Sequence, residues 1–305
     1  MSRRFVALAV LAIWAVGIAW LYRRNTLRTP EQVLAEAALR ISPATYYYIL
    51  EQNGKQVGAA SSGIDTTTSM IVSADFLRGA VPVGPDTLRI EARSEAQFTR
   101  GLRFRDFTIR ATGDLAPLSL RGVMQEGEQN TLLLTSKDEG ERAITQETIV
   151  TKPLFVPTMS PLPLLLRRAP RVGDTAQVAI FDPVSRKVRE VTMKIQADSL
   201  FLVADSAVLD STTGRWQRAH LDSIRGWRIT GRDAPITAWV DGSGRLLAAS
   251  EPGGISLVRT TFEIAFENWR IANLPSSRAS APVPAQTGAR AGSARLTPRE
   301  PATAR

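Results

Sequence analysis

The sequence predicts a mainly β protein, in which one large, twisted antiparallel sheet forms a sandwich or an open barrel. Two observations predict it: side chains alternate between apolar and polar along many short segments, and pairs of turn-forming residues separate these segments. The ends of the chain differ from this body. An apolar segment near the N-terminus predicts a transmembrane helix, and the C-terminal residues predict a disordered tail.

Composition excludes several kinds of site. The 305 residues include one His and no Cys, so the chain has no disulfide, no thiolate zinc or iron–sulfur site and no cysteine nucleophile. A single His also excludes a metal site with two His ligands from one chain. We therefore assign no catalytic, cofactor-binding or metal-binding residue, and no cofactor.

The net charge of +9 suggests nucleic acid at first sight. Residues 1–28 carry five Arg and no acid, and residues 275–305 carry five Arg and one acid, so the residues between them have no net charge. A nucleic-acid module should carry its positive patch on the folded body. We therefore expect no nucleic-acid partner.

Residues 1–28 are predicted to be a membrane anchor. Phe5–Tyr22 is an unbroken apolar run that would span about 27 Å as a helix, and Arg residues bracket it on both sides. The alternative is a signal peptide cleaved before Trp20, after the small residues Gly17 and Ala19. The long run favours an uncleaved, single-pass anchor in the cytoplasmic membrane, with a cytoplasmic N-terminus and the large domain in the periplasm or outside the cell.

Residues 29–43 are predicted to be a short helix or linker, which begins at Thr29-Pro30-Glu31 and ends at Ser42-Pro43. The β-domain follows over residues 44–272. Asn53-Gly54 predicts a hairpin, and residues 88–98 alternate as a half-buried strand. A change of phase near Asp106 predicts a bulge. Further strands are expected at 116–125, 131–136 and 142–149.

Residues 151–172 interrupt this pattern with five Pro, which exclude a central strand. We expect a crossing loop there, with a short helix at about 162–168. Strands then resume on both sides of Asp182-Pro183. The remaining strands are expected at 200–203, 216–221, 224–229, 236–240, 245–247 and 255–266, the last with Phe262, Ile264 and Phe266 on one face. Residues 273–305, rich in Pro, Ala and Arg, are the predicted disordered tail.

Four groups of residues carry a possible chemistry. His220 and Asp222 share a strand face, but no G-x-S-x-G motif supplies a nucleophile, so we favour a surface His. The Asp of four Asp-Ser pairs is expected in turns, and Asp241 at a hairpin tip. Two arginine groups could contact acidic lipid or polysaccharide, but a solvated face is favoured. Four Trp are expected to pack in the core and its rim. The Asp-Ser pairs begin at Asp198, Asp205, Asp210 and Asp222; the arginines are Arg100, Arg103, Arg105, Arg110 and Arg121, then Arg167, Arg168 and Arg171; the tryptophans are Trp216, Trp227, Trp239 and Trp269.

Several segments follow one another in a familiar order: Tyr48-x-x-Glu51-x-Asn53-Gly54-Lys55-x-Val57-Gly58, the Pro-rich Pro161–Leu166, Gly173-Asp174 with Phe181-Asp182-Pro183, and Ala238-Trp239-Val240-Asp241 with Gly244-Arg245. Over about residues 45–266 the chain resembles the β-rich extracytoplasmic domain that precedes the catalytic core of bacterial membrane-anchored transglutaminase-like proteins. Similar domains also stand alone as exported proteins. The resemblance implies fold and location, and without a Cys it brings no active-site residue.

These observations predict a membrane-anchored extracytoplasmic β-domain that acts by binding. Its partner would be another envelope protein, or an apolar or lipidic ligand held in the curved sheet. The alternative is a hydrolase-like envelope enzyme that uses carboxylates on the sheet. An open apolar groove would favour the ligand carrier, a filled core would favour a scaffold, and clustered buried carboxylates would favour the enzyme.

Overall fold

The computed structural model describes residues 35, 36, 38–83, 86–114, 117–138, 143–166, 170–232, 237–250 and 254–273, together with Trp14. The chain divides into residues 1–272 and 273–305, and the fold lies in the first unit. In the part of the chain described, no helix is long and apolar enough to cross a membrane. The predicted anchor Phe5–Tyr22, apart from Trp14, and the predicted tail beyond residue 273 lie outside the described residues.

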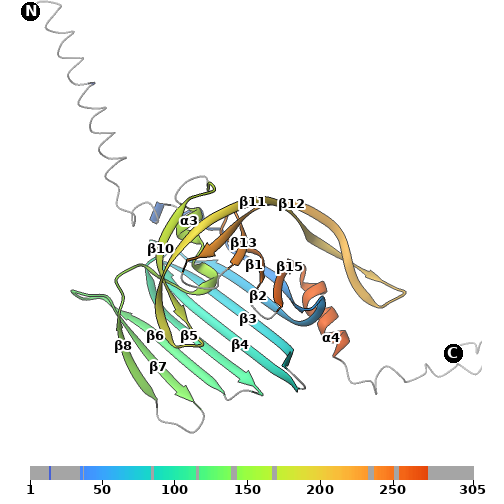
Figure 1. Ribbon diagram of the computed structural model, residues 1–305, viewed down its shortest axis with the longest axis horizontal. Coiled ribbons are helices and arrows are strands. Elements are labelled where there is room, and N and C mark those ends of the chain that lie inside the picture. Colours follow the sequence, from blue (N-terminus) through green and yellow to red (C-terminus); the bar gives the residue numbers. More distant parts are fainter. Residues whose placement is uncertain are drawn as a thin grey trace, which may run out of the picture. The chain divides into compact units, whose positions relative to one another are not determined.

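The described residues confirm a mainly β fold. Their strands form a single fifteen-stranded sheet in the order β8-β7-β6-β5-β4-β3-β2-β1-β15-β14-β13-β12-β11-β10-β9 (Figure 1). The bounds are β1 Ala44–Gln52, β2 Lys55–Thr66, β3 Met70–Val83, β4 Asp86–Thr99, β5 Phe104–Gly113, β6 Leu118–Gln125, β7 Thr131–Asp138, β8 Ile144–Ile149, β9 Leu154–Phe155, β10 Thr175–Asp182, β11 Lys187–Asp210, β12 Arg215–Gly231, β13 Thr237–Asp241, β14 Leu246–Ser250 and β15 Ile255–Thr260. The first and last strands pair at the centre, and a meander extends from each.

Several local predictions are confirmed. Asn53 and Gly54 both have positive φ, at 52° and 74°, as a two-residue hairpin turn requires, and they join β1 to β2. The predicted bulge lies at Arg105, where the register against β4 slips by one residue. This slip allows Phe104 and Phe107, three residues apart, to be buried on one face.

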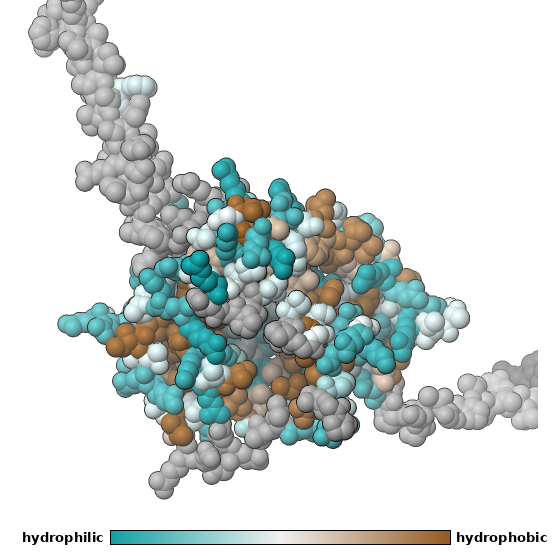
Figure 2. All heavy atoms as spheres, in the orientation of Figure 1, coloured by the Kyte–Doolittle hydropathy of each residue, from teal (hydrophilic) through white to brown (hydrophobic). Residues whose placement is uncertain are grey.

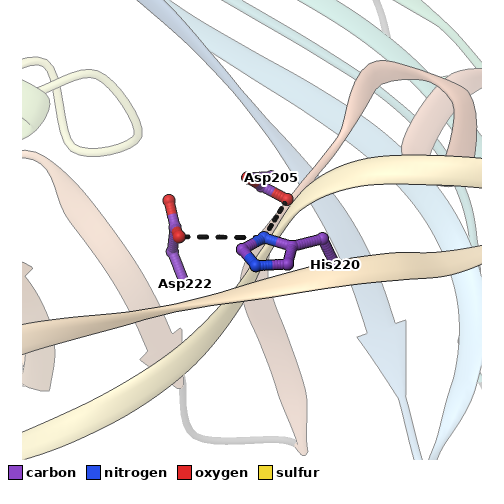
Figure 3. A group of neighbouring side chains, drawn as sticks. All are labelled: Asp205, His220 and Asp222. Atoms are coloured by element: carbon purple, nitrogen blue, oxygen red, sulfur yellow. Dashed lines mark ion pairs between the residues drawn. The ribbon is translucent and has the colours of Figure 1, made fainter.

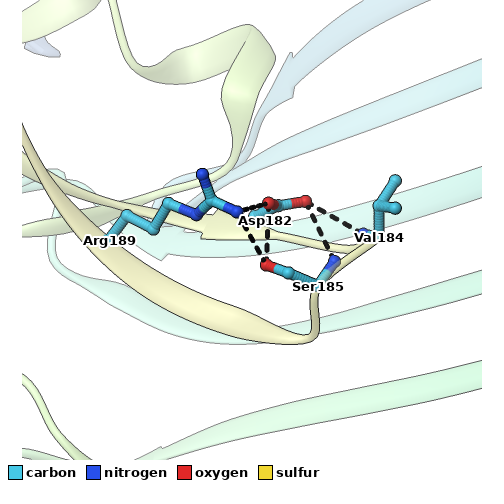
Figure 4. A network of polar contacts seen from close by, with 4 residues as sticks. All are labelled: Asp182, Val184, Ser185 and Arg189. Atoms are coloured by element: carbon cyan, nitrogen blue, oxygen red, sulfur yellow. Dashed lines mark hydrogen bonds and ion pairs between the residues drawn. The ribbon is translucent and has the colours of Figure 1, made fainter. Parts of the chain in front are cut away.

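The predicted turn at Asp182-Pro183 also forms, between β10 and β11 (Figure 4). Asp182 Oδ1 accepts the backbone N–H of Val184 at 3.0 Å, and Oδ2 accepts the hydroxyl of Ser185 at 2.7 Å and lies 2.8 Å from Arg189. Partial burial would raise the pKa of Asp182, but the hydrogen bonds from Ser185 and Val184 together hold that pKa below its ordinary value.

The Pro-rich segment is more than the crossing loop that the sequence predicts. The short helix is confirmed as α3, Leu162–Leu165, but β9 and a 3₁₀ turn η1, Pro157–Met159, precede it. β9 is an edge strand and pairs parallel with β10, so the sheet is not wholly antiparallel. An edge position tolerates the flanking prolines because only one side is hydrogen-bonded. The segment buries Phe155, Met159 and Leu162 at 1% exposure or less.

The core lies inside one curled sheet, where its two halves meet. Phe107 of β5 packs on Phe181 of β10 with ring centroids 4.5 Å apart, and Phe98 of β4 stacks on Phe155 of β9 at 5.9 Å. Strands that are far apart in the sheet order are therefore in contact across the interior. This curled single sheet is closer to the open-barrel prediction than to a sandwich.

The longest strands were predicted as separate short ones. β11 is a continuous strand of 24 residues, and it pairs with the 17 residues of β12 to form a ribbon that arches over the sheet (Figure 1). The predicted turn role is therefore wrong for Asp198, Asp205 and Asp222, which lie within strands. Asp210 does lie at the ribbon's tip, where it accepts the backbone N–H of Thr212 at 2.8 Å.

The predicted last strand, 255–266, is wrong beyond Thr260. A π-helix η2, Glu263–Glu267, and α4, Asn268–Ala272, follow β15. Phe262 and Phe266, which alternation would place on one strand face, instead stack at 5.4 Å across one helical turn. Both rings also contact Tyr47, so the same apolar spacing serves a helix here.

Asn268 fastens the tip of the ribbon to this helix. Its side chain accepts the backbone N–H of Trp216 and donates to the Trp216 carbonyl, both at 2.8 Å. We expect Asn268→Ala to lower the free energy of unfolding by about 1–3 kcal/mol, because two hydrogen bonds to one residue are lost. Hydrogen exchange at the Trp216 amide should accelerate, whereas Arg218→Ala, a nearby exposed change, should leave that amide slow. Unchanged exchange in Asn268→Ala would contradict the fastening.

Candidate functional site

The residues that the sequence singled out at His220 form an exposed cluster on the ribbon (Figure 3). His220 Nδ1 lies 3.0 Å from Asp205 Oδ1 and 3.8 Å from Asp222 Oδ1. A register shift at Asp205 brings this carboxylate beside the His, which the sequence did not predict. Ser206 donates its hydroxyl to Asp205, and among the described residues no hydroxyl is bonded to His220. The cluster therefore lacks the activated nucleophile of a serine hydrolase.

The predicted arginine surface is a solvated face with charges of both signs. Arg110 lines a shallow outer groove of about 690 Å³ together with Glu95 and Asp106. Arg103, Arg105 and Arg121 are exposed and Arg100 is half-buried, whereas Arg167 and Arg168 lie outside the described residues. Arg171 is exposed, and its backbone N–H donates to Asp174. The mixture of charges fits the solvated-face interpretation better than a site for acidic polymers.

The ribbon carries a group of exposed hydrophobic side chains. On the face shown in Figure 2, a group of hydrophobic residues lies over the arch of β11 and β12, and hydrophilic residues surround it. The large exposed hydrophobic residues of the ribbon are Leu200, Leu202, Val208, Leu209 and Leu221. Such a group on one element can contact another macromolecule.

A pocket of about 280 Å³ lies inside the curled sheet, just below the usual range of about 300–1,000 Å³ for small-molecule sites. Strands β1 to β5 supply one side, and the Pro-rich segment supplies the other through η1. Its walls are largely apolar and include Ile64, Leu77, Val156, Met159 and Phe181. The four tryptophans are not among its described lining residues, in keeping with their predicted packing role; Trp227, for instance, belongs to the main core.

Asp75 of β3 supplies the only carboxylate among the described residues that line this pocket. It accepts hydrogen bonds from three hydroxyls: Ser62 at 2.6 Å, Thr158 at 2.9 Å and Ser94 at 3.3 Å. Burial raises the pKa of Asp75 above its ordinary value, although these hydrogen bonds oppose the shift. The Thr158 bond connects the sheet to η1, so Asp75 also holds the two sides of the pocket together.

Other polar residues also line the pocket, among them Tyr48, Ser73 and Arg245. Burial raises the pKa of Tyr48 and lowers the pKa of Arg245. The hydroxyl of Ser73, which is 1% exposed, has no hydrogen-bond partner among the described residues. No partner is found there for the Tyr48 hydroxyl either, and the guanidinium of Arg245 donates one hydrogen bond, to the Ser42 carbonyl at 3.2 Å. Most of the hydrogen-bonding capacity of these groups is therefore unused.

Next to this pocket, Asp241 forms a buried ion pair with Arg259. It caps the predicted hairpin tip by accepting the Ser243 and Arg245 backbone N–H groups at 2.9 and 3.0 Å. Its second oxygen lies 3.0 Å from Arg259, and both side chains are at most 13% exposed. The guanidinium of Arg259 lies 3.6 Å from the ring centroid of Tyr46. The sequence predicted the hairpin tip but not this buried pair.

Sequence reasoning missed Asp75 because it assigned no strand between residues 60 and 87. A usable signal was present: Ile71, Ser73, Asp75 and Leu77 alternate with outward-facing residues on β3. A carboxylate at one of these inward positions marks either a turn or a polar group inside a core. The sequence alone could not separate the two, because the hydroxyls that hold Asp75 come from β2, β4 and η1.

Asp75 should make stability depend on pH. A carboxyl group whose pKa is higher in the folded than in the unfolded protein binds its proton more tightly when folded. The stability that it contributes is therefore lost as the pH rises from its unfolded pKa of about 4 through its folded pKa. We expect Asp75→Asn to remove this loss, so that the free energy of unfolding of the variant rises relative to that of the wild type between acid and neutral pH. Urea unfolding from pH 4 to 8 measures the gain, with the exposed Asp86→Asn as control. A constant difference at every pH would contradict the burial of a titrating Asp75.

No family model matches this sequence, and no curated protein matches it. Two similar solved structures are a β-barrel-like protein of the domain of unknown function DUF1849 from Brucella abortus and a DUF1089 family protein from Pseudomonas aeruginosa. The first is 12% identical over 72% of this chain and 95% of that chain, with a TM-score of 0.48. The second is 11% identical over 64% and 90%, with a TM-score of 0.33. Neither description concerns a transglutaminase, so that resemblance stays a prediction.

Proposed function

We propose that this chain is a membrane-anchored, extracytoplasmic β protein that binds a small apolar ligand inside its curled sheet. The pocket between the sheet and η1 carries the proposal. Its apolar walls surround a few fixed polar groups, as ligand sites in proteins usually do. At the packing density of protein interiors it has room for roughly ten non-hydrogen atoms. The main core of the described residues consists of packed aromatic and aliphatic side chains.

The same geometry gives no support to the hydrolase alternative. A hydrolase that works with a pair of carboxylates, as glycosidases do, would need two near the reacting bond, but Asp75 is the single one among the described pocket residues. Asp241 nearby is occupied by Arg259 and by backbone N–H groups. The cluster of Asp205, His220 and Asp222 is exposed, and none of these residues lines this pocket.

The location is proposed from the sequence. The apolar run Phe5–Tyr22 would hold the domain to the cytoplasmic membrane, with the domain in the periplasm or outside the cell. A reporter that is active only outside the cytoplasm, fused after residue 274 of the full chain, should be active. A fusion from which residues 1–28 are deleted should be silent. Activity only from a cytoplasmic reporter would refute this placement.

The ligand can be sought directly. The full chain, extracted from membranes and purified, should release a small apolar compound on solvent extraction, detected by mass spectrometry. Ala60→Trp, which adds bulk to a pocket-lining position of β2, should release less of it at equal protein. Equal recovery from both proteins would place the compound outside the pocket and count against the proposal.

A second candidate function, binding of another envelope protein, is favoured by the ribbon. Leu200 and Leu202 are 71% and 68% exposed there, which is unusual for adjacent same-face leucines of a strand. A photoreactive residue at position 202 should then crosslink to one defined protein in intact membranes. The same residue at position 184, which is exposed in the turn between β10 and β11, should not capture that protein.

A further inference from the structure

We infer that the pocket selects an apolar ligand that ends in an uncharged head group with both a donor and an acceptor, such as an alcohol or a primary amide. This inference rests on the proposed binding function and adds the chemistry of the ligand's polar end. It follows from the arrangement of Asp75, Tyr48 and Arg245 on largely apolar walls.

The first step is the balance of charge. Asp75 is held by three hydroxyls, and among the described residues no basic group lies within ion-pair distance of it. Arg245 likewise has no carboxylate within that distance among the described residues, and the neighbouring Asp241 is paired with Arg259 instead. Arg93 also lines the pocket, but its guanidinium is paired with Glu91 at 3.0 Å. Apart from that pair, the pocket carries one negative and one positive group that do not neutralise each other directly. A cationic ligand would gain from Asp75 what it loses to Arg245, and an anionic ligand the reverse, so neither has a net attraction to offset its lost hydration.

The second step is the balance of hydrogen bonds. A carboxylate offers about four acceptor positions, and three are taken at Asp75, so it can accept from one donor of a ligand. The Tyr48 hydroxyl and the remaining N–H groups of Arg245 can donate to an acceptor. A hydroxyl or amide group satisfies both sides at once, whereas an alkane leaves these buried groups unpaired, which is costly.

The experiment uses the full chain in lipid nanodiscs and isothermal titration with 1-octanol, octanamide, octylamine and octanoate at pH 7. Empty nanodiscs correct for partition into lipid. The alcohol and the amide should each bind at least ten-fold more tightly than the ammonium and the carboxylate. Equal binding of all four would overturn this inference and leave the pocket function in place. No binding by any of them would overturn both.

Two variants test the charge balance itself. Asp75→Asn leaves Arg245 as the single unpaired charge, so octanoate should bind at least ten-fold more tightly than it binds the wild type. Arg245→Met should favour octylamine by a similar factor. Asp86→Asn, an exposed change outside the pocket, should alter neither preference. If Arg245→Met does not fold, the Asp75→Asn titration decides alone, and an unchanged order of the four ligands would overturn the inference.

Discussion

Phe107→Ala is expected to lower the free energy of unfolding by about 3–5 kcal/mol, which is a large part of the stability of an ordinary domain. Phe107 is 1% exposed, and its ring lies 4.5 Å from that of Phe181 and 5.9 Å from that of Phe104. The Phe181 contact joins strands from opposite halves of the sheet. The variant would leave a cavity where these halves meet, and the rigid strands around it could not fill the space.

Urea unfolding followed by circular dichroism measures this loss. Leu200→Ala provides the control, because Leu200 is a strand residue that is 71% exposed, and its truncation should change stability by no more than about 0.5 kcal/mol. Similar losses in both variants would mean that the contact between Phe107 and Phe181 does not hold the halves together.

Gly58→Ala is expected to cost about 3 kcal/mol, at the upper end of what overpacking causes. Gly58 of β2 faces Gly79 of β3 in register. An added Cβ would lie 2.4 Å from the carbonyl oxygen of Arg78 and 2.8 Å from the Cα of Gly79. Both are backbone atoms, so no side-chain rotation can relieve the clash, and the two strands would have to separate. The Leu50 side chain also lies close to this glycine pair.

Gly127→Ala is the matched change. Gly127 has no backbone conformation that requires glycine, and the nearest atom to an added Cβ would be the Gln129 carbonyl oxygen at an ordinary 3.7 Å. Thermal unfolding should therefore show a lowered midpoint for Gly58→Ala and an unchanged one for Gly127→Ala. A Gly58→Ala protein as stable as the wild type would show that β2 and β3 can separate at no cost.

The sequence predicted best where one residue and its neighbours decide the structure. Asn53-Gly54 makes a hairpin whatever lies elsewhere, and the Arg105 bulge follows from a local change of phase. Prediction failed where distant contacts decide. Phe262 and Phe266 fit a strand or a helix by spacing, and Tyr47, more than 200 residues away, selects the helix. Asp198, Asp205 and Asp222 are common turn residues that strand pairing holds extended.

The site shows the same division. The neighbouring hairpin at Asp241 could be predicted from the sequence, because its turn residues are consecutive. The pocket could not be predicted from the sequence, because Asp75, Thr158 and Arg245 come from three distant segments. Only the curl of the sheet brings them together. Distances of this kind are fixed by tertiary packing, and no period or motif in one sequence records them.

The pairing of β1 with β15 has a consequence for the order of folding. Every other neighbouring antiparallel pair joins strands that follow one another along the chain, but this pair closes a loop of about 200 residues. Loop-closure entropy makes such a contact slow to form, whereas the two meanders on either side can assemble from local hairpins. The chain should therefore acquire two half-sheets early and join them late along this central seam. A circular permutant opened at residues 167–169 would reduce the loop closed by this seam from about 200 residues to about 90, and should shorten that final step.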